Sequence, residues 1–193
     1  MSALSHDHRG YLKVILGCMF SGKTSELIKE YNKWTACGFE CLMINHVSDK
    51  RYSDSEEKTF SHDGKMVFSI NVGDKLMDFF KKESYISRYE VILINEGQFF
   101  EDLYEFTDEL VNKYNKKVFV CGLDGDFQRK KFGSLLDIIP LCDDLVKLNA
   151  ICISCKCSNG IFTHRLSNEK KQTLIGAKNY IPLCRKCYNN YNN

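Results

Sequence analysis

The octapeptide "GCMFSGKT", Gly17 to Thr24, constrains the fold more than any other part of this sequence. It fits the pattern G-x-x-x-x-G-K-[ST], and it stands between an apolar, strand-like run at 11–17 and a helical pattern from Gly22 to about Ala36. In that setting the glycines let the backbone curl, so that main-chain N–H groups and the N-terminus of the helix face the oxygens of a phosphate group. The sequence therefore predicts an α/β fold built around a phosphate-binding loop.

Each position of this loop has an expected role. Lys23 is expected to reach the outer phosphates of a nucleoside triphosphate, and the hydroxyl group of Thr24 is expected to bind Mg²⁺. The other loop positions should surround the phosphates with their main chain: Gly17, Cys18, Met19, Phe20, Ser21 and Gly22. The alternative is an ordinary strand–helix turn that contains two glycines, and the complete motif in its expected setting argues against it.

Three further apolar runs, at 40–46, 90–95 and 117–123, are typical of buried strands, and the segments at 75–83 and 102–114 have helical spacing. Continuous apolar strands that alternate with helices predict a parallel sheet flanked by helices, of the RecA-like kind that carries a phosphate-binding loop. Such sheets bind ligands at the carboxyl ends of their strands. We predict a domain of this kind over 10–150 and a second, smaller unit over 151–193.

The stretch at 47–65, "VSDKRYSDSEEKTFSHDGK", differs from its surroundings because it is polar and almost free of aliphatic residues. Composition alone predicts a solvent-exposed surface loop. A mobile lid near a ligand is the other interpretation, since long loops within compact domains are often functional.

The ten cysteines are unevenly distributed. Five are scattered through the first 142 residues and are expected to be small buried side chains. The C-terminal part contains two C-x-x-C pairs, and 28 residues lie between Cys155 and Cys184. Four thiolates paired in this way predict a closed, structural Zn²⁺ site; a redox dithiol or free thiols are the alternatives, and Cys157 and His164 are spare candidate ligands. The predicted zinc ligands are Cys152, Cys155, Cys184 and Cys187.

The run "VILINEGQFF" ends a predicted strand on Asn95 and Glu96. An acidic residue at the first of these positions normally helps to hold Mg²⁺ beside a phosphate-binding loop, and here it is an asparagine. We predict a working site that needs a higher Mg²⁺ concentration, because an asparagine keeps an oxygen but lacks the charge. The alternatives are a crippled site and no site at all.

The formal net charge of +2 gives no reason to expect binding to nucleic acid or to a membrane. The first 13 residues lack the apolar core of a signal peptide, and no apolar run is long enough to span a bilayer. We expect a soluble, intracellular protein.

Four motifs occur here in one order and at one spacing: "GCMFSGKT", "INEGQFF", "CGLDGDFQRKKFG" and "CISC…LIGAKNY…CRKC". The sequence resembles the zinc-containing (type II) thymidine kinases of animals, bacteria and large DNA viruses over about residues 10–188. The resemblance implies transfer of the γ-phosphate of ATP to the 5′-hydroxyl of thymidine, which gives thymidine monophosphate for DNA synthesis. ATP, Mg²⁺ and structural Zn²⁺ are the implied cofactors.

The same resemblance implies roles for three further residues near the phosphates. Glu96 matches the catalytic base, which takes the proton of the attacking hydroxyl group. Asp49 and Arg51 match a D-x-R pair in the lid: Arg51 would stabilise charge on the transferred phosphoryl group, and Asp49 would act together with Asn95 at the metal. Most of the catalytic effect would come from positioning and electrostatics.

The resemblance also implies a pocket for the thymine base. Its apolar walls would be Met19, Phe99, Leu123, Phe127 and Phe132. Taken singly, each is more often a core residue than a pocket residue, and the resemblance reverses this for Phe127. The segment between the two cysteine pairs, residues 156–183, matches a loop called the lasso, whose main chain binds the edge of the base. The implied contacts there are Thr163, Gln172, Thr173, Leu174, Ile175, Gly176 and Tyr180. The spacing from Ile175 to Tyr180 is one residue shorter than the common pattern, so the register of Tyr180 is less fixed than that of Gly176.

As partners, the resemblance implies thymidine, with deoxyuridine as a second candidate, thymidine triphosphate as a feedback inhibitor, and assembly into a homotetramer or a dimer. The location implied is the cytoplasm, or the host cytoplasm for a viral source. The sequence ends six residues after Cys187, so we expect no long C-terminal regulatory tail.

Two alternatives stay open: a phosphate-loop ATPase whose zinc ribbon acts on nucleic acid, and a catalytically weak or inert nucleoside-binding relative, because of Asn95.

Overall fold

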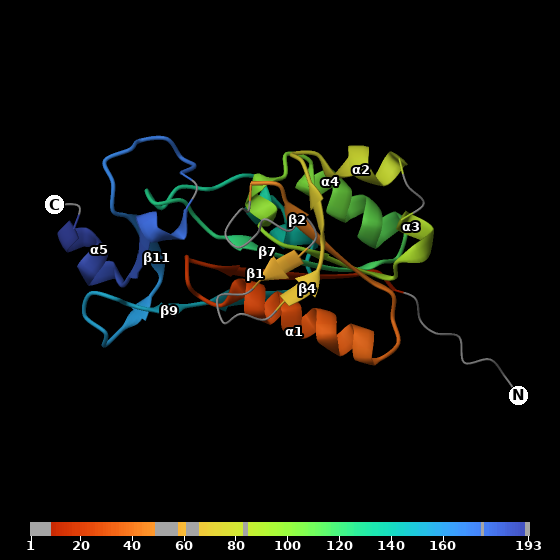
Figure 1. The fold of residues 1–193 in the computed structure, drawn as a ribbon, viewed down its shortest axis with the longest axis horizontal. Helices are drawn as coiled ribbons and strands as arrows, with labels where there is room; N and C mark the ends of the chain where they lie inside the picture. The colour runs from red at the N-terminus through yellow and green to blue at the C-terminus, as the bar shows by residue number, and fades with distance from the viewer. Residues whose placement is uncertain (1–8, 49–57, 61–65, 83–84, 175, 192–193) are drawn as a thin grey trace, which may run out of the picture.

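A computed structural model describes residues 9–48, 58–60, 66–82, 85–174 and 176–191. Its centre is a six-stranded sheet in the order β5-β2-β6-β7-β1-β8, in which every neighbouring pair is parallel (Figure 1). The strands are β1 (Tyr11–Gly17), β2 (Cys41–His46), β5 (Ile70–Val72), β6 (Val91–Ile94), β7 (Lys117–Leu123) and β8 (Asp144–Leu148). The predicted α/β class with a parallel sheet is confirmed.

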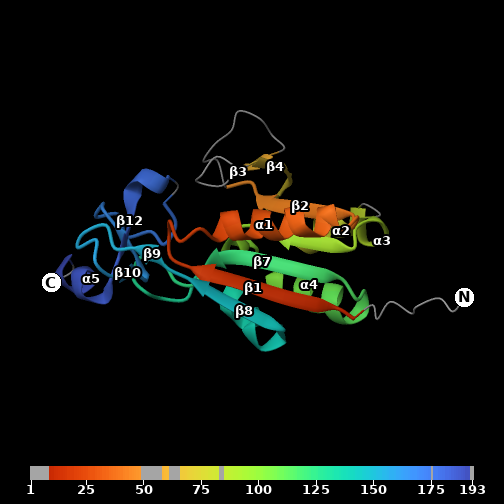
Figure 2. The same cartoon turned by 90° about the horizontal axis from the view of Figure 1, so that it is seen from below.

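Helices cover both faces of the sheet, which explains why the central strands are apolar throughout. The 14-residue helix α1 (Lys23–Ala36) covers one face, and α2 (Leu76–Lys82) and α4 (Leu103–Asp108) cover the other (Figures 1 and 2). In β6, Ile92 and Ile94 join the core on the α4 side, whereas Val91 and Leu93 join the core on the α1 side. Successive side chains of a strand point to opposite faces, so both faces need apolar residues.

The central strands and α1 begin and end within about one residue of the predicted limits, as expected for strongly patterned segments. The helical pattern at 102–114 proves to be α4 followed by a π-helical turn at Glu109–Lys113, and the short helix α3 (Tyr85–Arg88) lies after α2. The two edge strands, β5 and β8, were not predicted. Both are short and only partly buried, so neither has the continuous apolar run of a central strand.

The polar stretch at 47–65 is not entirely a loop. Residues Lys58–Phe60 form β3, which pairs in antiparallel fashion with β4 (Met66–Phe68). The expectation of a simple surface loop was wrong for this part, because the hairpin partner lies just beyond the polar stretch. The rest of the stretch, apart from residues 47–48, lies outside the described residues.

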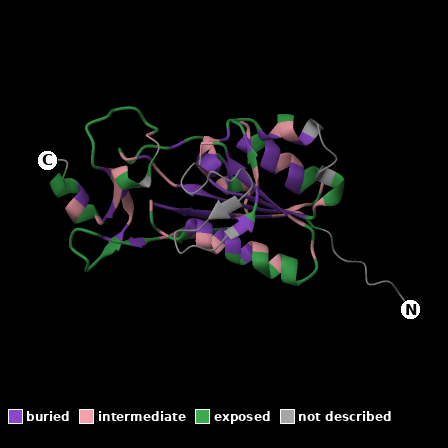
Figure 3. Ribbon diagram, viewed as in Figure 1, coloured by how far each residue is buried: buried purple, intermediate pink, exposed green. Residues whose placement is uncertain are grey.

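A small unit lies beyond the carboxyl ends of the sheet strands (Figures 1 and 2). It contains the hairpin pairs β9 (Ala150–Ile151) with β10 (Asn159–Gly160) and β11 (Phe162–Arg165) with β12 (Tyr180–Leu183), followed by α5 (Arg185–Tyr191). Of the short 3₁₀ helices, η4 (Ala177–Asn179) belongs to this unit, whereas η1 (Gly97–Phe99) and η3 (Leu135–Leu141) belong to the part of the chain that contains the sheet. The fully buried apolar core of the small unit consists of Cys152, Leu183 and Tyr188 among the described residues, and most of the loops of this unit are exposed (Figure 3). A unit with so small a core needs another source of stability.

None of the helices in the described parts of the chain is both long enough and apolar enough to cross a membrane.

Candidate active site

The phosphate-binding loop connects β1 to α1, and its two glycines are required for different reasons. Gly22, the residue before the helix, has a φ of 84° and a ψ of 16°, which lies in the left-handed region that favours glycine. A Cβ atom on Gly17 would lie 2.5 Å from both the carbonyl oxygen of Leu148 and the Oγ atom of Ser21. The first glycine therefore allows close packing of the loop, and the second allows the turn into the helix.

Lys23 and Thr24 occupy the first turn of α1 and are both buried. The Nζ atom of Lys23 donates a hydrogen bond to the carbonyl oxygen of Cys18 at 2.7 Å, so the ammonium group lies across the curled loop. The Thr24 hydroxyl donates to Oδ1 of Asn95 at 3.4 Å. The loop thus combines an ammonium group, a hydroxyl group and a helix N-terminus, which suits a polyphosphate with its metal ion.

Asn95 is fully buried and points toward the phosphate-binding loop. Its Oδ1 atom accepts hydrogen bonds from Thr24 and from the Sγ atom of Cys121, the latter at 3.1 Å, and its Nδ2 atom donates to Oδ1 of Asn45 at 2.9 Å. The side chain therefore presents a neutral oxygen to Thr24, where an aspartate would present a charged one. Its predicted role beside Mg²⁺ is compatible with this position.

Glu96 follows directly and has an unusual backbone. Its φ of 55° and ψ of 44° lie in the left-handed region, which non-glycine residues adopt rarely and often at functional sites. The carboxylate, on a residue that is 7% exposed, accepts a hydrogen bond of 2.6 Å from Nε2 of Gln98. Oε1 of Gln98 in turn accepts from the main-chain N–H of Leu123 at 3.0 Å. Gln98 therefore fixes the orientation of the Glu96 carboxylate.

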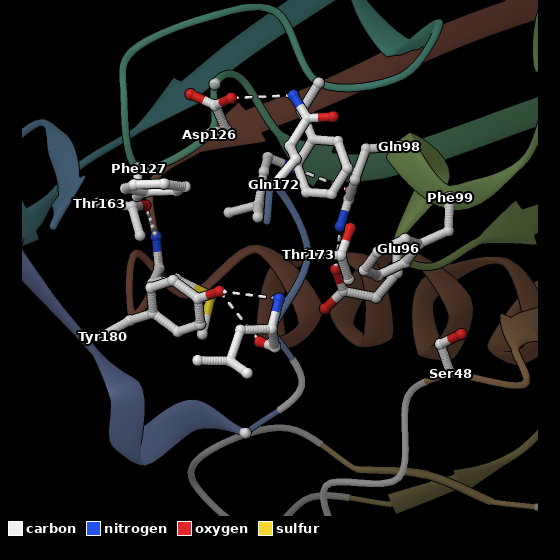
Figure 4. A pocket seen from close by; sticks show the side chains of 16 residues that line it. Ser48, Glu96, Gln98, Phe99, Asp126, Phe127, Thr163, Gln172, Thr173 and Tyr180 are labelled. Atoms are coloured by element: carbon white, nitrogen blue, oxygen red, sulfur yellow. Dashed lines mark hydrogen bonds between the residues drawn. The ribbon is translucent and has the colours of Figure 1, made fainter. Parts of the chain in front are cut away.

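A pocket opens between Glu96 and the lasso, with about 640 Å³ of empty space including its open mouth (Figure 4). Phe127 and Tyr180 lie on one side of this view, and Glu96 and Phe99 lie on the other. Twelve predicted site residues line the pocket: Met19, Glu96, Phe99, Leu123, Phe127, Phe132, Thr163, Gln172, Thr173, Leu174, Gly176 and Tyr180. Aromatic and aliphatic walls with a few polar groups are typical of a site for a small planar ligand.

Four lining residues were not predicted: Ser48, Gln98, Gly125 and Asp126. The predicted site residues Asp49, Arg51 and Ile175 lie outside the described residues. Phe99 and Phe132 contact each other edge to face, with ring centroids 5.5 Å apart, and together form one wall.

Two hydroxyl groups that line the pocket are bound to the protein itself. The Oγ1 atom of Thr163 accepts a hydrogen bond from the main-chain N–H of Met19 at 3.0 Å. The Tyr180 hydroxyl accepts from the N–H of Leu174 at 3.3 Å and donates to the carbonyl oxygen of the same residue at 3.0 Å. The polar atoms of Thr163 and Tyr180 thus support the pocket walls, and their apolar surfaces are what a ligand would meet.

The lasso is attached to the loop that follows β7 by side chains distant in sequence. Nε2 of Gln172 donates to Oδ2 of Asp126 at 2.8 Å and to the carbonyl oxygen of Lys131 at 3.2 Å (Figure 4). The other carboxylate oxygen of Asp126 accepts from the main-chain N–H groups of Gln128 and Lys130, at 2.8 and 2.9 Å. Asp126 both shapes its own turn and holds the lasso. An aspartate two residues before a turn amide is a local signal that could have identified it.

The four cysteines of the C-x-x-C pairs come together at the base of the lasso. All four sulfur atoms lie within 4.8 Å of one another, and those of Cys155 and Cys184 are 3.9 Å apart. Four sulfurs bound to Zn²⁺ at about 2.3 Å would be about 3.8 Å apart, so this cluster fits a tetrahedral zinc ion. A hydrogen bond from the main-chain N–H of Cys157 is the largest of the effects that lower the pKa of the Cys155 thiol to about 6, which favours the thiolate that a metal binds.

Neither spare candidate ligand belongs to this group of four, although the Cys157 side chain interacts with Cys155 and helps to lower the pKa of its thiol. The Sγ atom of Cys157 contacts Ser158, and the ring of His164 packs against the rings of Tyr188 and Tyr191. The prediction that the two C-x-x-C pairs supply the four metal ligands agrees with this arrangement.

Comparisons with known proteins identify the family of this chain. The sequence profile of a family described as "Thymidine kinase" matches residues 10–188. The thymidine kinase of Sheeppox virus (strain KS-1) is 37% identical over 186 residues, which cover 93% of this chain and 97% of the viral protein. The cytosolic thymidine kinases of Bos taurus and Homo sapiens are each 39% identical over 181 residues, which cover 93% of this chain and 72% and 74% of the mammalian proteins.

Proposed function

Because this chain belongs to the thymidine kinase family, we propose that it transfers the γ-phosphoryl group of ATP to the 5′-hydroxyl group of thymidine, giving thymidine monophosphate. One observation carries the assignment of the site. Asn95 contacts Thr24 of the phosphate-binding loop, and the next residue, Glu96, lines the pocket. A carboxylate is thereby held between a site for phosphates and a site for a planar ligand.

Glu96 is the proposed general base. It would take the proton of the 5′-hydroxyl group as the oxygen attacks the phosphorus atom, and the hydrogen bond from Gln98 would keep the carboxylate directed at that proton. The buried position limits competing water, and the left-handed backbone turns the side chain away from the strand into the pocket. The role of Gln98 is to position the base and not to exchange protons itself.

Lys23 and the main chain of the loop are proposed to bind the phosphates, and Thr24 and Asn95 to hold Mg²⁺. ATP supplies the transferred group, and Mg²⁺ neutralises part of its charge. The ammonium group of Lys23 lies across the loop, bonded to the Cys18 carbonyl, and would exchange this hydrogen bond for bonds to phosphate oxygens. Asp49 and Arg51 are retained as the proposed lid pair that would complete the charge stabilisation.

The pocket walls are proposed to receive the thymine base. Phe127, Phe99 and Phe132 offer aromatic faces and edges, and the lasso main chain around Gln172 to Gly176 offers hydrogen-bonding groups for the edge of the base. Deoxyuridine is a second candidate substrate, because it differs from thymidine by one methyl group. Thymidine triphosphate, which combines the base with a polyphosphate, is the proposed feedback inhibitor.

Zinc bound by Cys152, Cys155, Cys184 and Cys187 is proposed to be structural. Four protein ligands leave no open position for water, and the ion would join both ends of the lasso where the apolar core is small. We retain as proposals the division into 10–150 and 151–193, a homotetramer or dimer, a cytoplasmic location, and the absence of nucleic-acid and membrane partners.

Incubation of the purified protein with ATP, Mg²⁺ and thymidine tests the proposal, with thymidine monophosphate as the expected product. ATP hydrolysis that nucleic acid stimulates in the absence of nucleoside would instead indicate an ATPase. Thymidine binding without product would indicate an inert relative, and either result would overturn the proposed reaction.

A further inference from the structure

The guanidinium group of Arg165 occupies the base of the lasso tip, which we define as residues 166–179 between β11 and β12. Arg165 is the last residue of β11 and is only 4% exposed. Its Nη1 atom donates hydrogen bonds to the carbonyl oxygens of Glu169, at 2.8 Å, and of Lys171. Its Nη2 atom donates to the carbonyl oxygen of Gln172 at 2.8 Å and to the hydroxyl group of Tyr180 at 2.7 Å. One side chain thus holds three main-chain positions of the tip.

The same guanidinium group stacks on a wall of the pocket. Its Cζ atom lies 3.8 Å from the centroid of the Phe127 ring and 5.2 Å from that of the Tyr180 ring. Phe127 belongs to the loop after β7, and the lasso tip follows about 40 residues later in the sequence. Because the planar guanidinium group stacks on the Phe127 ring and also bonds to the lasso tip, it fixes the distance between the ring and the tip.

The Tyr180 hydroxyl extends this arrangement to the pocket surface. It accepts a hydrogen bond from Arg165 and exchanges hydrogen bonds with the main chain of Leu174. Gln172, Leu174, Phe127 and Tyr180 all line the pocket, and each is bound to Arg165 directly or through this hydroxyl group. Arg165 itself is not among the residues that line the pocket.

The charge of Arg165 argues against a purely space-filling role. A buried cation is costly unless its donors are satisfied. Both terminal nitrogen atoms of Arg165 donate to oxygen atoms, but its buried Nε atom has no hydrogen-bond partner among the described residues, so an apolar residue would fill the same space at lower cost. The bonds it makes here go to carbonyl and hydroxyl oxygens in a forked, planar arrangement that lysine cannot reproduce. The cost is justified if the arrangement of the tip matters for binding.

We infer that Arg165 is a positioning residue for the nucleoside: it holds the lasso tip and the Phe127 ring at the separation that a thymine base requires. This inference rests on the proposed function, because it concerns the same pocket. It predicts that Arg165 acts on nucleoside binding and leaves the phosphate-binding loop alone.

The test compares Arg165→Lys and Arg165→Met with a matched control, Arg185→Lys. The control removes a guanidinium group that lies 5.0 Å from another ring of the small unit, that of Phe162, and it is exposed. For both Arg165 variants we expect KM for thymidine to rise roughly 10- to 100-fold, the range for lost hydrogen bonds of a charged group. KM for ATP should stay within about twofold, and zinc content and the control variant should match the wild type.

Chemical rescue separates positioning from general stability. In Arg165→Ala, guanidinium chloride at a concentration that leaves the wild-type rate unchanged should lower KM for thymidine, and an equal concentration of ammonium chloride should not. An Arg165→Lys protein with wild-type KM for thymidine would overturn the inference. So would an equal loss of thymidine and ATP binding together with loss of zinc, because that pattern indicates only a folding defect.

Calorimetric titration with thymidine keeps this inference distinct from the proposed function. If the wild type binds no thymidine, the proposed function fails. If the wild type binds thymidine and Arg165→Lys binds it equally well, the proposed function stands and only the role of Arg165 is wrong.

Discussion

The phosphate-binding end of the sheet and the lasso border one pocket, but different contacts hold them in place. At the sheet, the loop is shaped by its own glycines and by a helix that begins directly after it. At the lasso, side chains hold the main chain in place: Arg165 and Tyr180 bond to the lasso tip itself, and Gln172 bonds to Asp126, 46 positions away. The first region is specified by residues that are neighbours in the sequence, whereas the second depends on side-chain hydrogen bonds, those of Gln172 spanning more than 40 positions, and on the cysteine cluster.

Two hydrogen bonds connect these regions directly. The main-chain N–H of Met19 donates to Oγ1 of Thr163, and the Sγ atom of Cys18 donates to the carbonyl oxygen of Gly160 at 3.1 Å. Burial raises the pKa of the Cys18 thiol, so this group stays protonated and remains a donor at neutral pH. These hydrogen bonds therefore fix the position of the phosphate-binding loop relative to the small unit, even though different contacts stabilise the two regions.

The largest expected effect concerns the sheet side. Glu96→Gln should reduce kcat by roughly 10²–10⁴-fold, the usual effect of removing a general base, while thymidine binding changes little because the pocket walls remain. Steady-state kinetics and calorimetry measure the two quantities. Glu101→Gln, at an exposed position, is the matched control. A Glu96→Gln protein that keeps more than half of the wild-type kcat would refute the assignment.

The lasso side should be most sensitive to loss of the metal. Cys184→Ser should release zinc and raise KM for thymidine strongly, or reduce the yield of folded protein, with less effect on ATP binding because the phosphate-binding loop is shaped by the sheet. Metal analysis and nucleotide titration provide the measurements. Cys157→Ser, outside the cluster, should keep its zinc. Near-stoichiometric zinc in Cys184→Ser would contradict the four-cysteine site.

Removal of one pocket wall should have a smaller effect. Phe127→Ala should weaken thymidine binding by roughly 1–3 kcal/mol, the range for one base–aromatic contact. The loss includes the stacking partner of Arg165, so the lasso tip should also become more mobile. Thymidine titration and thermal unfolding of the same protein decide the case. If both affinity and stability stay at wild-type values, Phe127 belongs to neither the pocket nor its support.

The smallest effect should come from Asn95→Asp. The new carboxylate would face Thr24 and should lower the Mg²⁺ concentration that gives half-maximal rate, with little change in KM for thymidine. Without metal the buried charge should reduce thermal stability, because Oδ1 of Asn45 lies 2.9 Å from the substituted atom.

Asn32→Asp, at an exposed position of α1, is the control for this substitution. An Mg²⁺ titration that is identical for Asn95→Asp and the wild type would show that residue 95 does not act on the metal. An inactive natural protein that Asn95→Asp converts into an active one would identify the chain as a non-catalytic relative.

The same contrast explains which parts could be predicted from sequence. The central strands and α1 were predicted because an apolar run or a helical period is a property of neighbouring residues. The edge strands β5 and β8 and the hairpin β3–β4 were missed, because short, half-exposed strands are defined by their partners and not by their own pattern. The phosphate-binding loop was predicted from its own short motif, and the role of Glu96 was predicted from the resemblance that the motif "INEGQFF" carries.

Gln98, Asp126 and Arg165 were missed for a related reason. Each is a polar residue whose role comes from partners far away in sequence: Gln98 bonds to a residue 25 positions away, and Asp126 to one 46 positions away. Arg165 stacks on Phe127 across a similar distance. No local pattern distinguishes Gln98 and Arg165 from ordinary surface side chains until the fold brings the partners together. Asp126 carries the local signal of its turn, but that signal does not reveal its contact with the lasso. The pocket walls themselves were identified through family resemblance.

Hydrogen–deuterium exchange tests the central claim most directly, namely that the sheet binds the phosphates and the lasso binds the nucleoside. The amides of 166–174 and of 22–27 would be compared in the free protein, with thymidine alone, and with a non-hydrolysable ATP analogue and Mg²⁺ alone. We predict that thymidine protects 166–174 and that the ATP analogue protects 22–27 with a much smaller effect on 166–174. Equal protection of the lasso by the ATP analogue, or no protection of the lasso by thymidine, would contradict the account.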